Sequence, residues 1–139
     1  MIELLKIAHA FRASLEAQRD LGLLPQHMSN FPRACCGVTS ELLGHYLNSK
    51  PSGSEAESVS ALRDGTPHIW LVVDSLVVDL TADQFPGRPA VYVGPWDDWY
   101  RSWEVDLRGK AQHCTTPTSY DEQAVLARII EQTGLPSFD

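Results

Sequence analysis

Residues 67–81 form two apolar runs on either side of Asp74-Ser75, and this pattern constrains the fold more than any other part of the chain. Each run is rich in β-branched and aromatic residues, which favours a β-strand. Two polar residues between two such runs are typical of a tight β-hairpin. The sequence therefore predicts an antiparallel pair of strands that are joined at Asp74-Ser75.

Three other segments have the apolar spacing of amphipathic helices. These are residues 2–20, 36–48 and 119–133, and a short run at 90–93 reads as one more strand. Helices followed by antiparallel strands are typical of the α+β class. We expect N-terminal helices packed on a small antiparallel sheet, in a single domain that covers residues 1–139.

Two segments carry weaker patterns. Residues 49–66 are small, polar and rich in residues that break regular structure, which predicts a flexible surface loop. Trp96, Trp99 and Trp103 recur at spacings of three and four, which fit either a helical turn or a loop. We expect these tryptophans in the core or at its edge, with an aromatic wall beside a functional cleft as the alternative.

Charge and hydropathy narrow the class of partner. The chain carries 11 basic and 18 acidic residues, a net charge of −7 at pH 7, and no basic stripe, which argues against a nucleic-acid partner. No run reaches the length of a membrane span, and no signal peptide is visible. We therefore expect no membrane partner and a cytoplasmic protein, with one domain of a longer or secreted protein as the alternative.

The chain has three cysteines, Cys35, Cys36 and Cys114. An odd number without the spacing of a disulfide framework predicts reduced thiols. The neighbours Cys35 and Cys36 are poorly placed to pair with each other, because the required geometry is strained. A bridge from either of them to Cys114 stays open.

The predicted helix and hairpin carry a thiol, an imidazole and a carboxylate, the three groups of a nucleophilic site. A cysteine at the start of the helix over 36–48 lies at the positive end of the helix dipole, which favours the thiolate. A two-residue hairpin loop places Trp70 opposite Asp79 and His68 opposite Thr81. His68 and Asp79 then share one face of the sheet as diagonal neighbours, roughly 7–8 Å apart. A three-residue loop would place them on opposite faces.

These residue types predict a Cys-His-Asp nucleophilic site. We assign the nucleophile to Cys36, whose side chain projects from the first helical turn, and prefer it to Cys35, which points elsewhere. His68 would serve as base and proton donor. Asp79 would orient the His68 ring, with Asp83 as the competitor for that role.

Donors for an oxyanion come from the same region. The backbone N–H of Cys36 is the first candidate, because it lies at a helix N-terminus. Ser29 and Asn30 are candidate side-chain donors in the preceding loop. Gln84 is another candidate, with a structural hydrogen bond to a loop as its alternative role.

The order of these residues resembles that of the papain-like and transglutaminase-like cysteine enzymes. Cys36-Gly37 at the head of a helix, the strand motif His68-Ile69-Trp70 and the segment from Asp79 to Phe85 carry the resemblance, within residues 30–93. Within this superfamily the chain is similar to small bacterial papain-fold domains of toxins and effectors. Their order is Cys on a helix, His on a strand and Asp on the next strand.

The resemblance implies a papain-like core with Cys36 as nucleophile, His68 as base and Asp79 as orienting acid. It also implies a cysteine hydrolase or acyltransferase that acts on an amide or thioester of a protein or peptide and needs no cofactor. Peptidase, deamidase and transamidase activities share the thioacyl intermediate and stay open. The oxyanion or substrate-binding candidates are Asn30, Gln84 and Trp70. The chain departs from the family in two ways: Cys35 adjoins the nucleophile, and Asn30 stands near where papain-type enzymes keep a glutamine.

Two other functions stay open. A catalytically silent site on the same fold would leave a binding protein, for example an acidic partner that neutralises a basic protein. Metal-ligand residue types occur at Cys35, Cys36, His68, Asp79, His113 and Cys114. They lack the paired spacing of known metal motifs, so we expect no bound metal.

Overall fold

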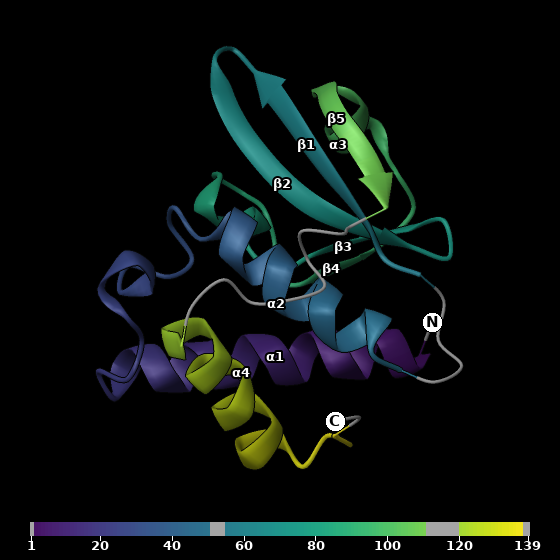
Figure 1. Ribbon diagram of the computed structural model, residues 1–139. Coiled ribbons are helices and arrows are strands. Elements are labelled where there is room, and N and C mark those ends of the chain that lie inside the picture. Colours follow the sequence, from purple (N-terminus) through teal and green to yellow (C-terminus); the bar gives the residue numbers. More distant parts are fainter. Residues whose placement is uncertain (1, 51–54, 111–119, 138–139) are drawn as a thin grey trace.

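The computed structural model describes residues 2–50, 55–110 and 120–137 of the chain. Its elements in chain order are α1 (Ile2–Asp20), η1 (Gln26–Met28), α2 (Cys36–Asn48), β1 (Glu57–Arg63), β2 (Thr66–Val73), β3 (Leu76–Asp79), η2 (Ala82–Gln84), β4 (Tyr92–Gly94), α3 (Asp98–Arg101), β5 (Glu104–Lys110) and α4 (Tyr120–Thr133). Three long helices and one antiparallel sheet make up most of the structure (Figure 1). The predicted α+β class is confirmed.

The sheet is built around the predicted hairpin. Its strand order is β4-β3-β2-β1-β5, and every neighbouring pair is antiparallel. Asp74 and Ser75 join β2 to β3 with φ of 53° and 66°, the left-handed backbone that a tight two-residue hairpin turn requires. Leu71 pairs with Val78, which confirms the predicted register and puts His68 and Asp79 on one face.

Side chains of successive strand residues point to opposite faces, so the sheet separates two cores. Leu71, Val73 and Val78 pack with the helices in a mainly aliphatic core. Trp70 and Val77 point the other way, into a cluster rich in aromatic rings. We call this second cluster the aromatic core; its buried members are Val59, Ala61, Trp70, Val72, Val77, Tyr100 and Trp103. Figure 1 shows α1, α2 and α4 together on one side of the sheet.

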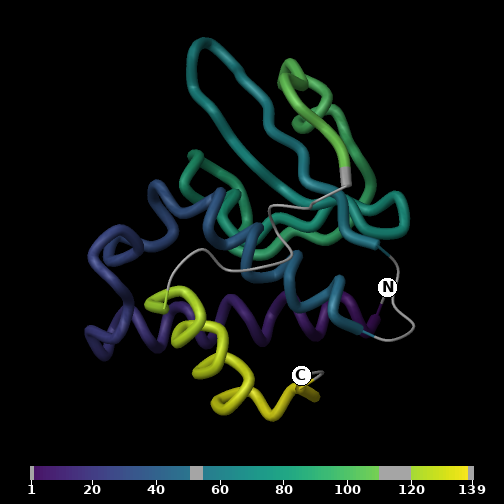
Figure 2. The backbone as a smooth tube through the Cα atoms, viewed as in Figure 1, coloured from purple at the N-terminus to yellow at the C-terminus, as the bar shows by residue number. Residues whose placement is uncertain are grey.

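The first and last helices pack against each other, although they lie at opposite ends of the chain (Figure 2). The apolar face of α1 explains its burial, and two polar side chains of α1 reach α4. Gln18 Nε2 donates to the Val125 carbonyl at 3.3 Å, and Ser14 Oγ donates to Gln132 Oε1 at 2.6 Å. These bonds satisfy groups that burial would otherwise leave unpaired.

Two strands differ from the sequence-based expectation. The predicted loop over 49–66 is wrong for its second half, because β1 (Glu57–Arg63) lies there and pairs with both β2 and β5. Its serines and alanine have weak strand propensity, and tertiary pairing overrides that preference. The segment of β5 (Glu104–Lys110) had no predicted structure, since charged residues alternate along it. That pattern is common in a strand at the edge of a sheet.

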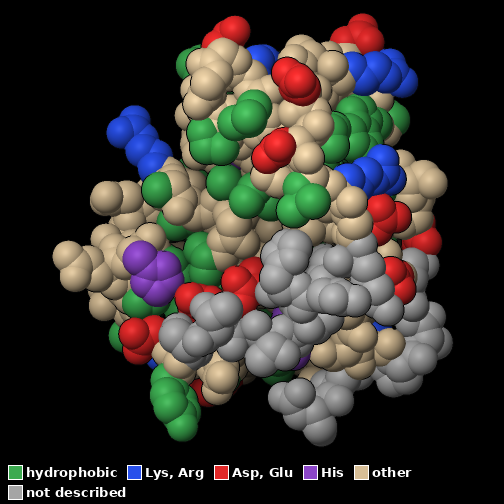
Figure 3. All heavy atoms as spheres, turned by 45° about the horizontal axis from the view of Figure 1, so that its top comes forward, with side chains coloured by type: hydrophobic (Ala, Val, Ile, Leu, Met, Phe, Trp, Pro, Cys, Tyr) green, Lys and Arg blue, Asp and Glu red, His purple; other side chains and the backbone are tan. Residues whose placement is uncertain are grey.

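The surface mixes side chains of every kind. On the face shown in Figure 3, basic side chains are dispersed among acidic and hydrophobic ones rather than gathered in a stripe. Within residues 2–50, 55–110 and 120–137, none of the helices has the length and apolar character needed to cross a lipid bilayer.

Candidate active site

The two neighbouring cysteines have different environments at the start of α2. Ala34, with a left-handed φ of 58°, turns the chain just before them. Cys35 precedes the helix and is fully buried, with its Sγ 3.8 Å from the Met28 carbonyl oxygen. Burial raises the pKa of the Cys35 thiol to about 11, so this thiol keeps its proton at neutral pH. Cys36 is the first residue of α2 and is partly exposed, and both thiols are free.

His68 lies on β2 with its imidazole fully buried. Its Nε2 lies 2.7 Å from Oδ2 of Asp79, which is at the end of β3. Burial by itself lowers the pKa of His68, but hydrogen bonds to Asp79 and Cys36 and the negative charge of both groups outweigh it. The net result raises the pKa of His68 to about 9. The imidazole therefore carries a proton at neutral pH.

The other ring nitrogen of His68 faces the cysteine side of the site. Because Asp79 occupies Nε2, Nδ1 is the nitrogen left for a hydrogen bond with Cys36. The side-chain amide of Gln84, in η2, also lies here, with Nε2 3.4 Å from His68 Nδ1. The imidazole thus connects the carboxylate on one side with a thiol and an amide on the other.

Asp79 is held from several directions. Its Oδ1 accepts a hydrogen bond from the Thr81 backbone N–H at 3.0 Å and a longer one from the Thr81 hydroxyl at 3.4 Å. Its Oδ2 accepts from the Tyr100 hydroxyl at 2.9 Å, in addition to the contact with His68. Both oxygens are therefore satisfied, which stabilises a buried carboxylate in one orientation.

Aromatic rings surround the His68 imidazole. The ring centroid lies 5.0 Å from that of Phe85, 5.6 Å from Trp70 and Trp103, and 6.3 Å from Trp99. The expectation that the tryptophans lie in the core or at its edge is confirmed, because Trp103 is buried in the aromatic core and Trp96 and Trp99 pack against it. This wall keeps water from His68 and so strengthens its electrostatic interactions.

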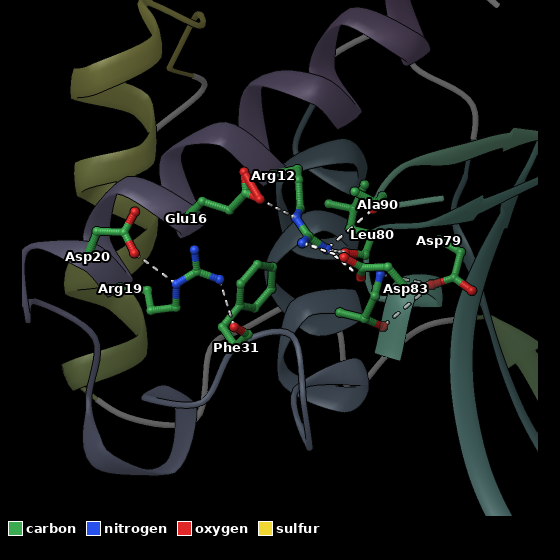
Figure 4. A network of polar contacts seen from close by, with 10 residues as sticks. Arg12, Glu16, Arg19, Asp20, Phe31, Asp79, Leu80, Asp83 and Ala90 are labelled. Carbon is green, nitrogen blue, oxygen red and sulfur yellow. Dashed lines mark hydrogen bonds and ion pairs between the residues drawn. The ribbon is translucent and has the colours of Figure 1, made fainter. Parts of the chain in front are cut away.

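Asp83, the competitor for the orienting role, has a different partner. Arg12 of α1 donates to both of its oxygens, from Nη1 at 2.8 Å and from Nη2 at 2.7 Å (Figure 4). Arg12 Nη1 also donates to the Leu80 carbonyl at 2.8 Å. Asp83 therefore ties η2 to α1, and Asp79 alone of these two carboxylates contacts His68.

Of the other predicted site residues, two contact His68 and two do not. Gln84 and Trp70 both contact His68, and Trp70 does so as a fully buried member of the aromatic core. Asn30 is exposed in the turn before α2, and its backbone carbonyl accepts from the Arg33 N–H at 2.9 Å. The Ser29 hydroxyl donates to the Gln26 carbonyl at 2.8 Å. Among the residues described, no contact brings Ser29 or Asn30 to the site.

Tyr100 is the residue that the sequence analysis missed. It lies on α3, which Asp97 caps by accepting a hydrogen bond from the Tyr100 N–H. Burial raises the pKa of Tyr100 well above its ordinary value, so its hydroxyl stays protonated and donates. The sequence does signal the start of this helix, because aspartate is a preferred N-cap residue. It does not reveal the contact with Asp79.

The part of the chain that the structure describes holds no cluster of three or more His, Cys, Asp or Glu side chains with the geometry of a metal site. His113 and Cys114 lie outside the described residues, and so does any bridge to Cys114.

Comparisons of the chain with protein families, with curated proteins and with solved structures give no match.

Proposed function

We propose that this protein is a cysteine-dependent hydrolase or acyltransferase of the papain-like and transglutaminase-like type, acting on an amide or thioester of a protein or peptide. The observation that carries the proposal is the position of His68. It is bound on one side to a fully satisfied carboxylate, and Cys36, at the first turn of a helix, lies close enough to raise its pKa. This is the arrangement that activates a cysteine nucleophile.

The first half of the reaction acylates Cys36. The thiolate attacks the carbonyl carbon, a C–S bond forms, and the carbonyl electrons move to oxygen. When the tetrahedral intermediate collapses, the C–N bond breaks and the His68 imidazolium gives its proton to the departing amine. The products are a thioester on Cys36 and a neutral imidazole, whose positive charge has left with the proton.

The second half releases the acyl group. His68 takes a proton from the incoming water or amine as its oxygen or nitrogen attacks the thioester carbon. The C–S bond then breaks and restores the thiolate beside a protonated His68. Water gives a carboxylic acid, as in a peptidase or deamidase, whereas an amine gives a new amide.

The developing oxyanion needs hydrogen-bond donors near Cys36. The backbone N–H of Cys36 is one of the first N–H groups of α2, which have no partner within the helix. The Gln84 amide is a predicted side-chain donor that contacts His68, with its Nε2 3.4 Å from His68 Nδ1. We assign these two groups to the oxyanion.

The test is the pH–rate profile of iodoacetamide labelling, with peptide mapping, on the native protein and on His68→Ala. A free thiol with an ordinary pKa of about 8.5 is less than about 1 per cent thiolate near pH 6. We expect Cys36 to label rapidly there, and His68→Ala to slow it on the order of 100-fold. Cys35 is the internal control, because its buried thiol should stay unlabelled. His9→Ala, an exposed histidine on α1, is the matched variant that should change nothing.

A Cys36 that labels no faster than an ordinary thiol, or that is indifferent to His68, contradicts the catalytic proposal. That outcome favours the catalytically silent binding protein instead. Rapid, His68-dependent labelling would justify a screen of amide and thioester substrates with water and amines as acceptors.

A further inference from the structure

Asp79 Oδ2 is shared between two donors from different elements. His68 Nε2, from β2, lies 2.7 Å from it, and the Tyr100 hydroxyl, from α3, lies 2.9 Å from it. All three side chains are buried, so water does not compete for these bonds. A buried hydroxyl that donates to the carboxylate of the proposed triad is placed to influence the imidazole without touching the thiol.

Arg88 continues the chain of contacts beyond Tyr100. Its guanidinium lies 5.4 Å from the Tyr100 ring centroid and 4.3 Å from that of Trp99. Arg88 therefore places a positive charge beside the Tyr100 ring, on the side of the aromatic core that holds Asp79 and His68.

We propose that Tyr100 is a positioning residue of the Cys36–His68–Asp79 site, which acts through the hydrogen bond from its hydroxyl to Asp79 Oδ2. The hydroxyl takes up part of the charge on this oxygen and so limits how strongly Asp79 holds the His68 proton. A proton that is held less tightly passes more readily to the leaving group. This inference rests on the proposed function, because it describes how the same site is tuned.

Tyr100→Phe is the direct test, since it removes only the hydroxyl and keeps the ring. Without that donor, Asp79 Oδ2 keeps more charge for His68, and the imidazolium becomes more stable. In the pH–rate profile of Cys36 labelling, the upper inflection reports the loss of the His68 proton. We expect Tyr100→Phe to move this inflection upward by about 0.5–1 pH unit.

Two more variants separate tuning from loss of structure. Tyr92→Phe is the matched control: the Tyr92 ring packs 5.0 Å from that of Tyr100, but its hydroxyl donates to the Pro95 carbonyl. It should leave the inflection unchanged. Arg88→Met keeps an apolar chain beside Trp99 and should shift the inflection in the same direction as Tyr100→Phe, by less.

The outcomes distinguish this inference from the proposed function. If the native protein shows rapid, His68-dependent labelling and Tyr100→Phe moves the inflection upward, the positioning role is supported. If the native labelling is as expected but Tyr100→Phe leaves the inflection unchanged or lowers it, only the positioning role is overturned. If the native Cys36 is not activated at all, the proposed function fails first.

Discussion

Asp79 and Asp83 lie four residues apart and each binds a basic side chain from a distant part of the chain, yet the two pairs differ in what they leave free. Arg12 meets Asp83 with two parallel bonds and uses its remaining donors on the Leu80 carbonyl and Glu16. His68 meets Asp79 with one nitrogen and keeps the other for the cysteine side. The Arg12–Asp83 pair joins structural elements only, whereas the His68–Asp79 pair leaves His68 Nδ1 available to Cys36.

The difference between the two pairs distinguishes a structural ion pair from one that can take part in catalysis. A guanidinium stays charged throughout the physiological range and gives up no proton, so the Arg12–Asp83 pair can only hold elements together. An imidazole exchanges a proton within that range. A buried imidazole that has one nitrogen anchored and the other directed at a thiol is therefore a candidate for catalysis.

The largest expected contrast between the two pairs is in the pH dependence of stability. The pKa of His68 is about 9 in the folded protein against an ordinary value of 6.5. The native state therefore binds more protons than the unfolded state between these values, so this stabilisation is full below pH 6.5 and is lost as the pH rises through 9. The shift corresponds to about 3 kcal/mol of unfolding free energy at most.

Urea unfolding of Cys36→Ala across this pH range measures the effect, because the proposed Cys36 thiolate would contribute a slope of opposite sign. His68→Gln on the same background is the variant in which the effect should vanish. The buried thiol of Cys35, whose pKa is raised to about 11, also lowers the stability of the folded protein as the pH rises. It does so only from about pH 9 upward. A stability of Cys36→Ala that stays flat up to pH 9 would contradict the protonated state of His68.

A smaller contrast comes from replacing each carboxylate in turn. Asp83→Asn leaves the buried Arg12 with only the partly exposed Glu16 as a charged partner and should cost about 2 kcal/mol of unfolding free energy, with Cys36 labelling unchanged. Asp79→Asn removes the charge that holds the imidazolium and should slow labelling near pH 6 about tenfold. Parallel urea unfolding and iodoacetamide labelling of both variants would show this. Equal effects of the two substitutions on labelling would refute the distinction between the pairs.

Much of this comparison could be predicted from the sequence. The two-residue break at Asp74-Ser75 determines the hairpin register, and the register places His68 and Asp79 on one face. The start of α2 at Cys36 follows from the apolar spacing of the next helical turns. These are local patterns, and local patterns are what a single sequence shows most directly.

Contacts between distant segments could not be predicted in the same way. The partner of Asp83 is 71 residues away, on α1, and that of Tyr100 is 21 residues away, on β3. Strand β1 was missed because its serines and alanine acquire strand structure only between two neighbours. The sequence places the reactive groups on their elements, whereas tertiary packing decides which carboxylate reaches the histidine.

The protonation of His68 can be followed by NMR titration of its ring nitrogens in the native protein and in Cys36→Ala. We expect an imidazolium at neutral pH that loses its proton near pH 9, and a lower pKa in Cys36→Ala, because the hydrogen bond and charge of the thiolate are gone. A His68 that is neutral at pH 7 and titrates identically in the two proteins would rule out the proposed Cys36–His68 pair.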